Sequence, residues 1–462
     1  MPLPKPIPKI SLTAMIRRLL PRAVSWGAAL AIALLVNGCQ PVAADDTASG
    51  GVSQSDIQLI ERTIKEVQKS YVEPVKPDEL TTNALKGMLT RLDPHSDYMD
   101  EREFRELMAT TSGQFGGVGI EISVDDGVPQ VISAIEGTPA ASAGLNPGDR
   151  IIKADGSPLV GMDIEEVVRK LRGAPGTPVT LTIARSGRAS FDVKITRAII
   201  KVDSVKAHLE PGHVGYVRIS TFDENTPTEL RAAIGKMKQE AGGNYAGFIL
   251  DLRNDAGGLL DAAVETAADF LDSGTVVTTK GRDPDENRIY DAAPNGDLIR
   301  GVPLVVLING ASASASEIVA GALQDDHRAV VLGTRSFGKG SVQSIIPIED
   351  RGALRLTTAL YYTPSGRSIQ GQGITPDEVV PLPKDQQVAN ALVTYESDLY
   401  GTLKPTGALA PTNPGPTPAP QTGGQQGVDH PINPSIIGTP QDAQLQAALE
   451  YLKKHPRSTA AR

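Results

Sequence analysis

The sequence predicts an α/β protein that begins with a helical region and carries an inserted, mainly-β domain. From about residue 202, short apolar runs typical of buried strands alternate with stretches of helical periodicity, which indicates an α/β core. Between residues 112 and 197 the pattern changes to short strands separated by glycine- and proline-containing turns. At 462 residues the chain is long enough for about three domains.

The composition excludes several classes of protein. A net charge of -9 and a pI near 5.3 argue against a nucleic-acid-binding protein. The single cysteine, Cys39, rules out an intramolecular disulfide, and no Cys/His cluster has the spacing of a zinc site. We therefore expect neither a metal nor another cofactor.

Residues 1–44 have the three-part plan of a secretory signal, with basic residues, an apolar run (Val24 to Val36) and then small residues. Two processing sites remain open. Val36 to Cys39 resembles a bacterial lipobox, which would attach a lipid anchor at Cys39, whereas Val42-Ala43-Ala44 resembles an ordinary signal-peptidase site. The apolar run is shorter than the roughly 20 residues of a spanning helix. Either site predicts a mature protein in the bacterial periplasm or cell envelope.

Residues 53–110 predict a helical region without catalytic residues. Apolar residues recur at helical spacing over residues 56–70, a second helix is expected from about Pro77 to Leu92, and a third from Arg102 to Met108. His95, between two aspartates, is better explained by the chemistry of a turn than by metal binding.

Residues 112–197 resemble a PDZ domain in the glycine-rich stretch Phe115 to Ile122, the turns that follow, a helix over residues 163–171 and a strand over residues 178–185. Backbone N–H groups in such a loop can receive the C-terminal carboxylate of a peptide. The resemblance assigns this role to Val118, Gly119 and Ile120. It also places Arg172 where a contact between the PDZ domain and the core is expected, with a solvated arginine as the alternative.

The serine-rich stretch after the apolar run 303–308 is the predicted centre of the chemistry. A serine there lies at a strand-to-helix turn, beside the N–H groups of a helix N-terminus that can stabilise an oxyanion. A serine nucleophile needs a base, and the stretch offers His327 and Lys339. A lysine acts as a base only when burial or nearby positive charge lowers its pKa. Gln343 follows Lys339 closely enough to hold its amine by a neutral hydrogen bond.

A second turn, after the predicted strand 247–252, contains Gly257 and Gly258. Glycines let backbone N–H groups approach a substrate carbonyl, so this turn is a candidate oxyanion-binding element. A pair of glycines that caps a helix is the alternative.

These motifs together resemble the carboxyl-terminal processing proteases, also called tail-specific proteases, over roughly residues 56–400. The resemblance implies a serine/lysine dyad of Ser314 and Lys339, with Gln343 orienting the lysine and Ser312 and Ser316 in packing roles. It implies an oxyanion hole made by Ala315 and Gly257, with Gly258 as the alternative donor. The family commonly has Asn-Pro where this chain has Asp255-Ala256, which puts the rigidity and charge of that turn in question.

The expected activity is that of an exported serine endopeptidase that binds protein or peptide substrates with apolar C-termini, with an activator or adaptor protein and a homo-oligomer as further expected partners. The expected domains are the signal segment (1–44), the helical region (53–110), the PDZ domain (112–197), the protease core (202–400), a disordered Pro/Gly-rich linker (405–440) and a C-terminal helix (442–455). A catalytically silent PDZ adaptor is the alternative from another class. A PDZ-containing protease with a His/Asp/Ser triad is a third, and it lacks the expected Gly-Asn-Ser-Gly-Gly loop here.

Overall fold

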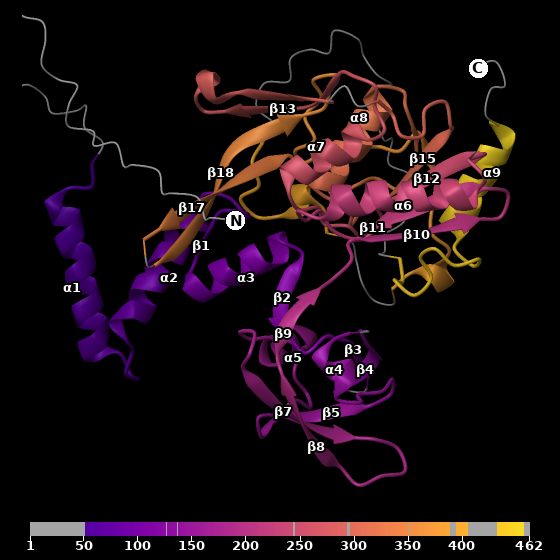
Figure 1. Ribbon diagram of the computed structural model, residues 1–462. Helices are drawn as coiled ribbons and strands as arrows, with labels where there is room; N and C mark the ends of the chain where they lie inside the picture. Colours follow the sequence, from indigo (N-terminus) through magenta and orange to yellow (C-terminus); the bar gives the residue numbers. More distant parts are fainter. Residues whose placement is uncertain are drawn as a thin grey trace, which may run out of the picture. The chain divides into compact units, whose positions relative to one another are not determined.

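The computed structural model describes residues 51–125, 127–135, 137–243, 245–292, 296–349, 351–388, 394–404 and 432–456 (Figure 1). The chain divides into two compact units between Ser70 and Tyr71. The described part of the first unit is α1 (Gln54–Ser70), an amphipathic helix whose Ile57, Leu59 and Ile60 are exposed. The signal segment and Cys39 lie outside the described residues.

The second unit begins with two helices and a short strand. These elements are α2 (Pro77–Leu89), β1 (Asp97–Met99) and α3 (Glu101–Thr111). α2 starts with a proline at its first position, where the missing N–H costs no hydrogen bond. A capping box formed by Asp100 and Glu103 starts α3. The three helices predicted from periodicity are therefore present, with ends that differ by a few residues.

The region with the PDZ-like sequence forms a sheet in the order β3-β4-β5-β7-β8, with β6 paired to β5. Its elements are β3 (Ile120–Asp125), β4 (Val128–Ala134), α4 (Pro139–Ser142), β5 (Arg150–Ala154), β6 (Ser157–Pro158), α5 (Ile164–Leu171), β7 (Pro178–Ala184) and β8 (Phe191–Thr196). Alternate residues of β7, including Val179, Leu181 and Ile183, are fully buried in one apolar core. A separate ribbon of β2 (Gln114–Gly117) and β9 (Ala198–Lys201) pairs the two ends of this region.

The protease-like region is built on a sheet in the order β10-β11-β12-β15-β16-β19, parallel from β11 onward. The strands are β10 (Val205–Glu210), β11 (Val214–Ile219), β12 (Gly247–Asp251), β15 (Leu304–Ile308), β16 (Val330–Gly333) and β19 (Glu378–Val379). Every residue of β12 and β15 is buried, as expected for parallel strands covered on both faces.

Alternating side chains of these strands supply two cores. Phe248 and Leu250 pack with α6 (Thr226–Glu240), α7 (Leu260–Ala268) and α8 (Ala315–Asp325) on one face. Ile249, between them, packs on the other face with α9 (Ala443–Lys454) (Figure 1). The carboxyl ends of β12 and β15 therefore meet at one edge, above the N-termini of α7 and α8.

A second sheet runs β1-β18-β13-β14, with β17 paired to β18. Its remaining strands are β13 (Thr275–Gly281), β14 (Arg288–Asp291), β17 (Ser341–Ile348) and β18 (Gly352–Tyr362), and short 3-10 turns lie at Pro284–Glu286, Lys384–Gln386 and Glu396–Asp398. β10, β13 and β14 lie where the sequence pattern indicated no element.

The chain is already structured at residue 432, inside the stretch predicted as a disordered linker. Ile432 is fully buried and bridges Gln387, and residues 433–442 form hydrogen-bonded turns that lead into α9. Burial of Ile432 and contacts to the protease-like region order this stretch despite its Pro/Gly-rich composition. Residues 405–431 of the predicted linker lie outside the described residues. No described helix has the length and hydropathy that a bilayer crossing needs.

Candidate active site

Ser314 lies in the turn that connects β15 to α8, one residue before the helix begins. Its backbone has φ 55° and ψ -111°, a conformation that is uncommon for a residue with a side chain. Such conformations persist where the surroundings hold them, and they are frequent at functional sites. The Ser314 N–H donates to Glu317 Oε2 at 2.8 Å, and the side chain is half-buried. The next residue, Ala315, is the first residue of α8, so its N–H points away from any intrahelical acceptor.

Ser312 and Ser316 are fully buried, and their hydroxyl groups are used inside the protein. The Ser312 hydroxyl donates to the Leu252 carbonyl at 2.8 Å and accepts from the Asn309 N–H at 2.9 Å. The Ser316 hydroxyl donates to the Asp255 carbonyl at 3.0 Å. Both serines therefore tie the β15–α8 turn to the turn that follows β12.

Lys339 lies in the loop between β16 and β17, and its side chain is half-buried. Burial, followed by the positive charge of Arg355 in β18, lowers the pKa of the Lys339 amine below its ordinary value, whereas Glu396, Glu317 and Asp93 act in the opposite direction. No hydrogen bond to its Nζ is formed by the residues that the structure describes. At a given pH, the neutral form of the amine is therefore more populated at Lys339 than at an exposed lysine.

Gln343 lies in β17, directly after a shift in the β17–β18 register between Val342 and Gln343. Its Nε2 donates to Ser341 Oγ at 3.0 Å and to Thr357 Oγ1 at 3.2 Å. Both bonds use the amide NH2 group, so the carbonyl oxygen is the atom left for another donor. Thr357 in turn donates to Asp93 Oδ1 at 3.0 Å, which fixes the orientation of this part of the site.

Glu317 joins the serine turn to the lysine loop. This carboxyl group is fully buried, and it accepts four hydrogen bonds: from the Ser314 N–H and the Lys339 N–H at Oε2, and from the Ser336 hydroxyl and the Gly338 N–H at Oε1, over 2.5 to 2.9 Å. Burial raises the pKa of Glu317 to about 7, and the four donors limit the rise. The sequence analysis did not assign Glu317 a role, although a glutamate three residues after a helix-capping serine is a recognisable signal.

Tyr361 of β18 makes a second connection between the same segments. Its hydroxyl donates to the Lys339 carbonyl. Burial raises the pKa of this hydroxyl well above its ordinary value, and a hydrogen bond with the Ser314 side chain acts in the opposite direction. Glu317 thus holds the backbones of both Ser314 and Lys339, and Tyr361 holds the Lys339 backbone while its hydroxyl is influenced by the Ser314 side chain.

His327 lies elsewhere. It is exposed in the turn after α8, at the end of the helix opposite Ser314. The helix is 11 residues long, which corresponds to about 16 Å at roughly 1.5 Å per residue. The structure therefore does not bring this histidine to the serine turn.

The turn after β12 brings Gly257 against the serine turn. A Cβ on Gly257, whose φ is +97°, would lie 2.7 Å from the Ala313 carbonyl oxygen, 2.8 Å from the Ala315 nitrogen and 2.9 Å from the Ser314 Cβ. Only a glycine fits there, as expected if a backbone group has to approach the nucleophile closely. The Gly257 N–H, however, donates to Asp255 Oδ1 at 2.8 Å. The donor predicted for the oxyanion hole is therefore engaged within the protein in this conformation. Gly258, by contrast, is exposed, and its N–H has no acceptor among the described residues.

The two turns are bonded along their length. The Asn254 N–H donates to Asn309 Oδ1 at 3.0 Å, and Asn309 Nδ2 donates back to Asn254 Oδ1 at 2.7 Å. The Asp255 carbonyl accepts from the Ala313 N–H at 3.0 Å as well as from Ser316. The serine turn is thus held on both sides of Ser314 by one peptide group.

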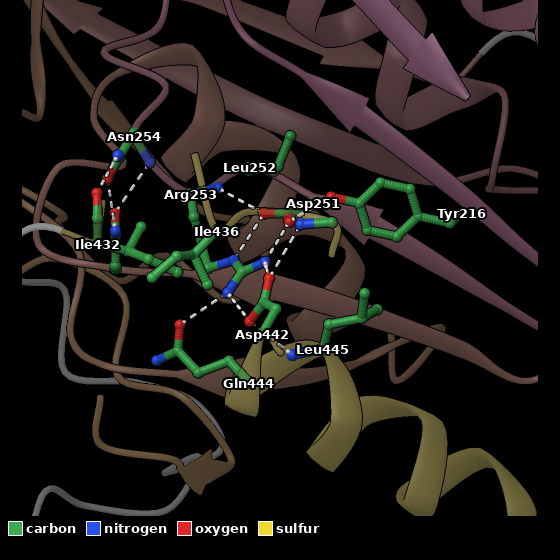
Figure 2. Close-up of polar contacts among 12 residues, drawn as sticks. Tyr216, Asp251, Leu252, Arg253, Asn254, Ile432, Ile436, Asp442, Gln444 and Leu445 are labelled. Carbon is green, nitrogen blue, oxygen red and sulfur yellow. Dashed lines mark hydrogen bonds and ion pairs between the residues drawn. The ribbon is translucent and has the colours of Figure 1, made fainter. Parts of the chain in front are cut away.

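Beneath these turns, the Arg253 guanidinium is fully buried in an ionic cluster (Figure 2). It donates to Asp251 and Asp442 through Nη2 at 2.5 and 2.6 Å, and to Gln444 Oε1 through Nη1 at 3.0 Å. Tyr216 adds a hydrogen bond to Asp251 at 2.8 Å. Burial alone would raise the pKa of Asp251, but the positive charges of Arg253 and Arg218 hold this pKa below its ordinary value. The cluster attaches the start of α9 to the end of β12.

A series of hydrogen bonds that the sequence analysis did not predict begins at Gly340, the residue after Lys339. The Gly340 N–H donates to Gln370 Oε1 at 2.9 Å, and Gln370 Nε2 donates to Glu396 Oε1 at 2.7 Å. Glu396 Oε2 lies 2.7 Å from Nε2 of His95. The residues that form these hydrogen bonds are far apart in the sequence, so no local sequence pattern could have indicated them.

In the PDZ-like region, the predicted carboxylate loop precedes β3. Val118 and Gly119 are buried, and their carbonyls accept from Ala140 and Ile135 at 2.9 and 3.0 Å. Gly119 has φ +82°, and a Cβ there would overlap the Thr138 side chain. Ile120 begins β3. Arg172 stacks on the Phe115 ring of β2 at 4.3 Å, which is a contact to the β2–β9 ribbon. Its role between the PDZ domain and the core stays a prediction.

The described residues contain no group of three or more His, Cys, Asp or Glu side chains arranged to hold a metal ion.

Comparisons with known proteins agree with the resemblance read from the motifs. Residues 213–380 match peptidase family S41, residues 130–185 match a PDZ domain, and residues 37–103 match the N-terminal domain of the activating protease CtpB. Two relatives are a carboxy-terminal-processing protease of Bartonella bacilliformis, 49% identical over 341 residues (73% of this chain, 78% of that protein), and the carboxy-terminal processing protease CtpA of Bacillus subtilis, 32% identical over 377 residues (81% and 79%).

Among solved structures, a photosystem II D1 C-terminal processing protease is 30% identical, covers 71% of this chain and 94% of its own, and has a TM-score of 0.43. The S41 match contains both the serine turn and the lysine loop, and the relatives extend over most of the chain. The chain therefore belongs to the carboxy-terminal processing proteases of peptidase family S41, serine-type peptidases that here carry a PDZ domain.

Proposed function

We propose that this protein is an exported endopeptidase that cleaves peptide bonds with a dyad of Ser314 and Lys339. The observation that carries the proposal is the pair of connections through Glu317 and Tyr361, which hold the serine turn and the lysine loop together. The lysine is also half-buried, with its pKa lowered mainly by burial. These are the conditions under which a lysine can act as a general base.

In the proposed reaction, the neutral Lys339 amine takes the proton of the Ser314 hydroxyl as the serine oxygen attacks the scissile carbonyl. The resulting ammonium then gives the proton to the leaving amine, and water releases the acyl group from the serine. We propose that the Gln343 carbonyl oxygen accepts a hydrogen bond from the lysine amine, since the amide NH2 group is already used by Ser341 and Thr357. The Ala315 N–H stabilises the oxyanion, with the second donor supplied by the Gly257–Gly258 turn.

Variants of the purified mature protein test the dyad on an unfolded substrate with an apolar C-terminal tail. We expect Ser314→Ala to lower kcat/KM by roughly 10⁴-fold or more, as loss of the nucleophile does in other serine peptidases. We expect a comparable loss with Lys339→Ala. Matched controls are Ser344→Ala in β17 and Lys206→Ala in β10, together with His327→Ala, all of which should retain activity. Cleavage by Ser314→Ala, or loss with His327→Ala alone, would overturn the dyad.

The PDZ domain is proposed to bind the C-terminal carboxylate of the substrate at the loop of Val118, Gly119 and Ile120. Support comes from the match to a PDZ domain and from the glycine backbone at Gly119, which allows no side chain. Amidation of the substrate tail should raise KM by roughly 10- to 150-fold, since a charge-assisted hydrogen bond contributes roughly 1.5–3 kcal/mol. An unchanged KM would argue against recognition of the carboxylate. Tail binding without cleavage by every form, wild type included, would instead indicate a silent adaptor.

Export is proposed from the sequence of residues 1–44 alone. Cell fractionation of the full chain, with Cys39→Ala as the variant that prevents lipid attachment, separates the two processing sites. A lipoprotein would move from the membrane to the soluble envelope fraction on this substitution, whereas a protein cleaved at Ala44 would not move.

A further inference from the structure

Asp255, in the turn after β12, has a buried carboxyl group with an incomplete set of hydrogen bonds. Its side chain is fully buried, and its Oδ1 accepts the Gly257 N–H at 2.8 Å. Its Oδ2 is buried without a hydrogen-bond partner among the described residues. A buried carboxylate with one unpartnered oxygen is energetically unfavourable unless a proton neutralises it.

The N–H held by Asp255 belongs to the residue that lies closest to the nucleophile in this turn. The site that a Gly257 side chain would occupy is within 2.9 Å of both the Ala315 nitrogen and the Ser314 Cβ. An oxyanion bound by Ala315 would therefore form beside the Gly257 peptide group. Two negatively charged groups, the oxyanion and the Asp255 carboxylate, would then compete for one donor.

The surroundings of Asp255 do little to stabilise its negative charge. Arg218 of β11 is the charged group that attracts it, and the Gly257 N–H of its own turn and the Ser316 hydroxyl of α8 are the neutral donors near it. Burial outweighs all three and raises the pKa of Asp255 to about 7.

We propose that Asp255 is a positioning residue of the oxyanion hole, which releases the Gly257 N–H to the substrate when its carboxyl group is neutral and withholds it when the group is ionised. The proposal rests on the proposed function, because it presumes that an oxyanion forms at Ser314. The proton enters from solvent at Oδ2, the oxygen without a partner. The hydrogen bond from the Gly257 N–H to Oδ1 is broken, and no covalent bond besides the new O–H bond is made or broken.

The proposal gives the enzyme two opposing dependences on pH. Activity rises with pH as Lys339 loses its proton, and it falls with pH as Asp255 loses its proton. Asp255→Asn keeps an oxygen that can accept the Gly257 N–H but cannot become charged. This variant should therefore keep the first dependence and lose the second.

The test is the ratio of kcat/KM of Asp255→Asn to that of the wild type, measured from pH 5.5 to 9.5. We expect a ratio near one at pH 5.5 to 6 and a rise of about tenfold per pH unit above 7, from single-proton titration, up to the roughly 10²–10³-fold effect of one oxyanion donor. Asp269→Asn is the matched control, because burial also raises the pKa of Asp269 while Arg231 pairs with it at 2.9 Å. Its ratio should not change with pH.

A ratio for Asp255→Asn that stays constant with pH, or falls as pH rises, would overturn the proposal. If the Asn variant has a lowered Tm, Asp255→Ala gives a second measurement, since it frees the Gly257 N–H entirely and should show the same rise. Binding of a tail-peptide boronic acid, measured by calorimetry at pH 8 in buffers of different ionisation enthalpy, needs no turnover. The wild type should take up about one proton more than Asp255→Asn.

Failure of this proposal differs from failure of the proposed function. If Ser314→Ala is inactive and the Asp255→Asn ratio is constant, the dyad stands and the role of Asp255 falls. If Ser314→Ala retains activity, both fall.

Discussion

Glu317 and Asp255 are buried carboxyl groups on either side of Ser314, and burial raises the pKa of each to about 7, yet their contacts differ. Glu317 accepts four hydrogen bonds from two loops, whereas Asp255 accepts one and keeps an oxygen without a partner. The difference separates a carboxyl group that holds the site together from one whose protonation can change at little structural cost. The following predictions test that separation first with variants, in decreasing order of effect, and then with the pH dependence of stability.

Asp442→Ala sets the scale for a fully paired buried carboxylate. It removes one of the two carboxylates that neutralise Arg253, and the remaining buried charge is then balanced by Asp251 alone. We expect the free energy of unfolding to fall by about 3–5 kcal/mol in urea denaturation. Glu450→Ala, an exposed change in the same helix, is the control. A loss of under about 1 kcal/mol for Asp442→Ala would mean that the number of ion pairs a buried carboxylate makes does not predict its contribution to the free energy of unfolding in this protein.

Glu317→Gln tests the scaffold role. The amide places an NH2 group where one carboxylate oxygen now accepts two hydrogen bonds, so two donors are left facing a donor. We expect kcat/KM to fall by roughly 100-fold and the free energy of unfolding by about 2–4 kcal/mol. Glu265→Gln, at an exposed position on α7, should change neither quantity. Activity close to that of the wild type would show that Glu317 is not what holds the two loops.

Ser336→Ala removes one of the four donors to Glu317 and the acceptor of the Ile374 N–H. We expect the free energy of unfolding to fall by about 1–3 kcal/mol and kcat/KM to fall several-fold. The exposed hydroxyl of Ser344, which pairs with Thr358, provides the matched Ser→Ala control. If the two variants are equally stable, the hydrogen bonds of the Ser336 hydroxyl do not contribute measurably to stability.

The pH dependence of stability tests the protonation of Asp255 directly. Because the pKa of Asp255 is about 7 in the folded protein and 3.8 as the ordinary value, the folded state binds more protons between these pH values. Stability of the wild type relative to Asp255→Asn should therefore fall as pH rises from about 4 to 7 and stay constant above 7. Chemical denaturation of both proteins at matched pH measures the difference. A difference that does not change with pH would place the folded-state pKa of Asp255 at its ordinary value.

Strand and helix periodicity predicted the order of elements along the protease-like region well, because its strands are uniformly apolar and its helices amphipathic. Most ends agree within a few residues, as for the predicted strand 247–252 and observed β12 (Gly247–Asp251). β13 and β14 were missed, since their threonines and charged residues carry no clear alternation. At Ile432 the error was the opposite one, because a structured segment was predicted to be disordered. Its composition is that of a linker, but residues distant in the sequence bury Ile432 and order the segment.

The segments of the candidate site were predicted from motifs, but the hydrogen bonds that connect these segments were not. The resemblance to the protease family implied Ser314, Lys339 and Gln343. It did not indicate that Glu317 and Tyr361 connect the serine turn to the lysine loop, because those contacts join distant parts of the sequence. The same limit explains Gly257. The pair of glycines predicted a backbone group that approaches a substrate carbonyl, but it could not reveal that Asp255 holds the Gly257 N–H two residues away.

The Arg253 cluster also bears on the order in which the protein becomes functional during synthesis. Arg253 and Asp442 are 189 residues apart, so a ribosome adding roughly 5–20 residues per second needs about 10–40 s to make the second after the first. During that interval the strand end beneath the active-site turns carries a guanidinium that lacks one of its two counter-ions. The ion pairs beneath the active-site turns can therefore be completed only after nearly all of the described sequence has been made.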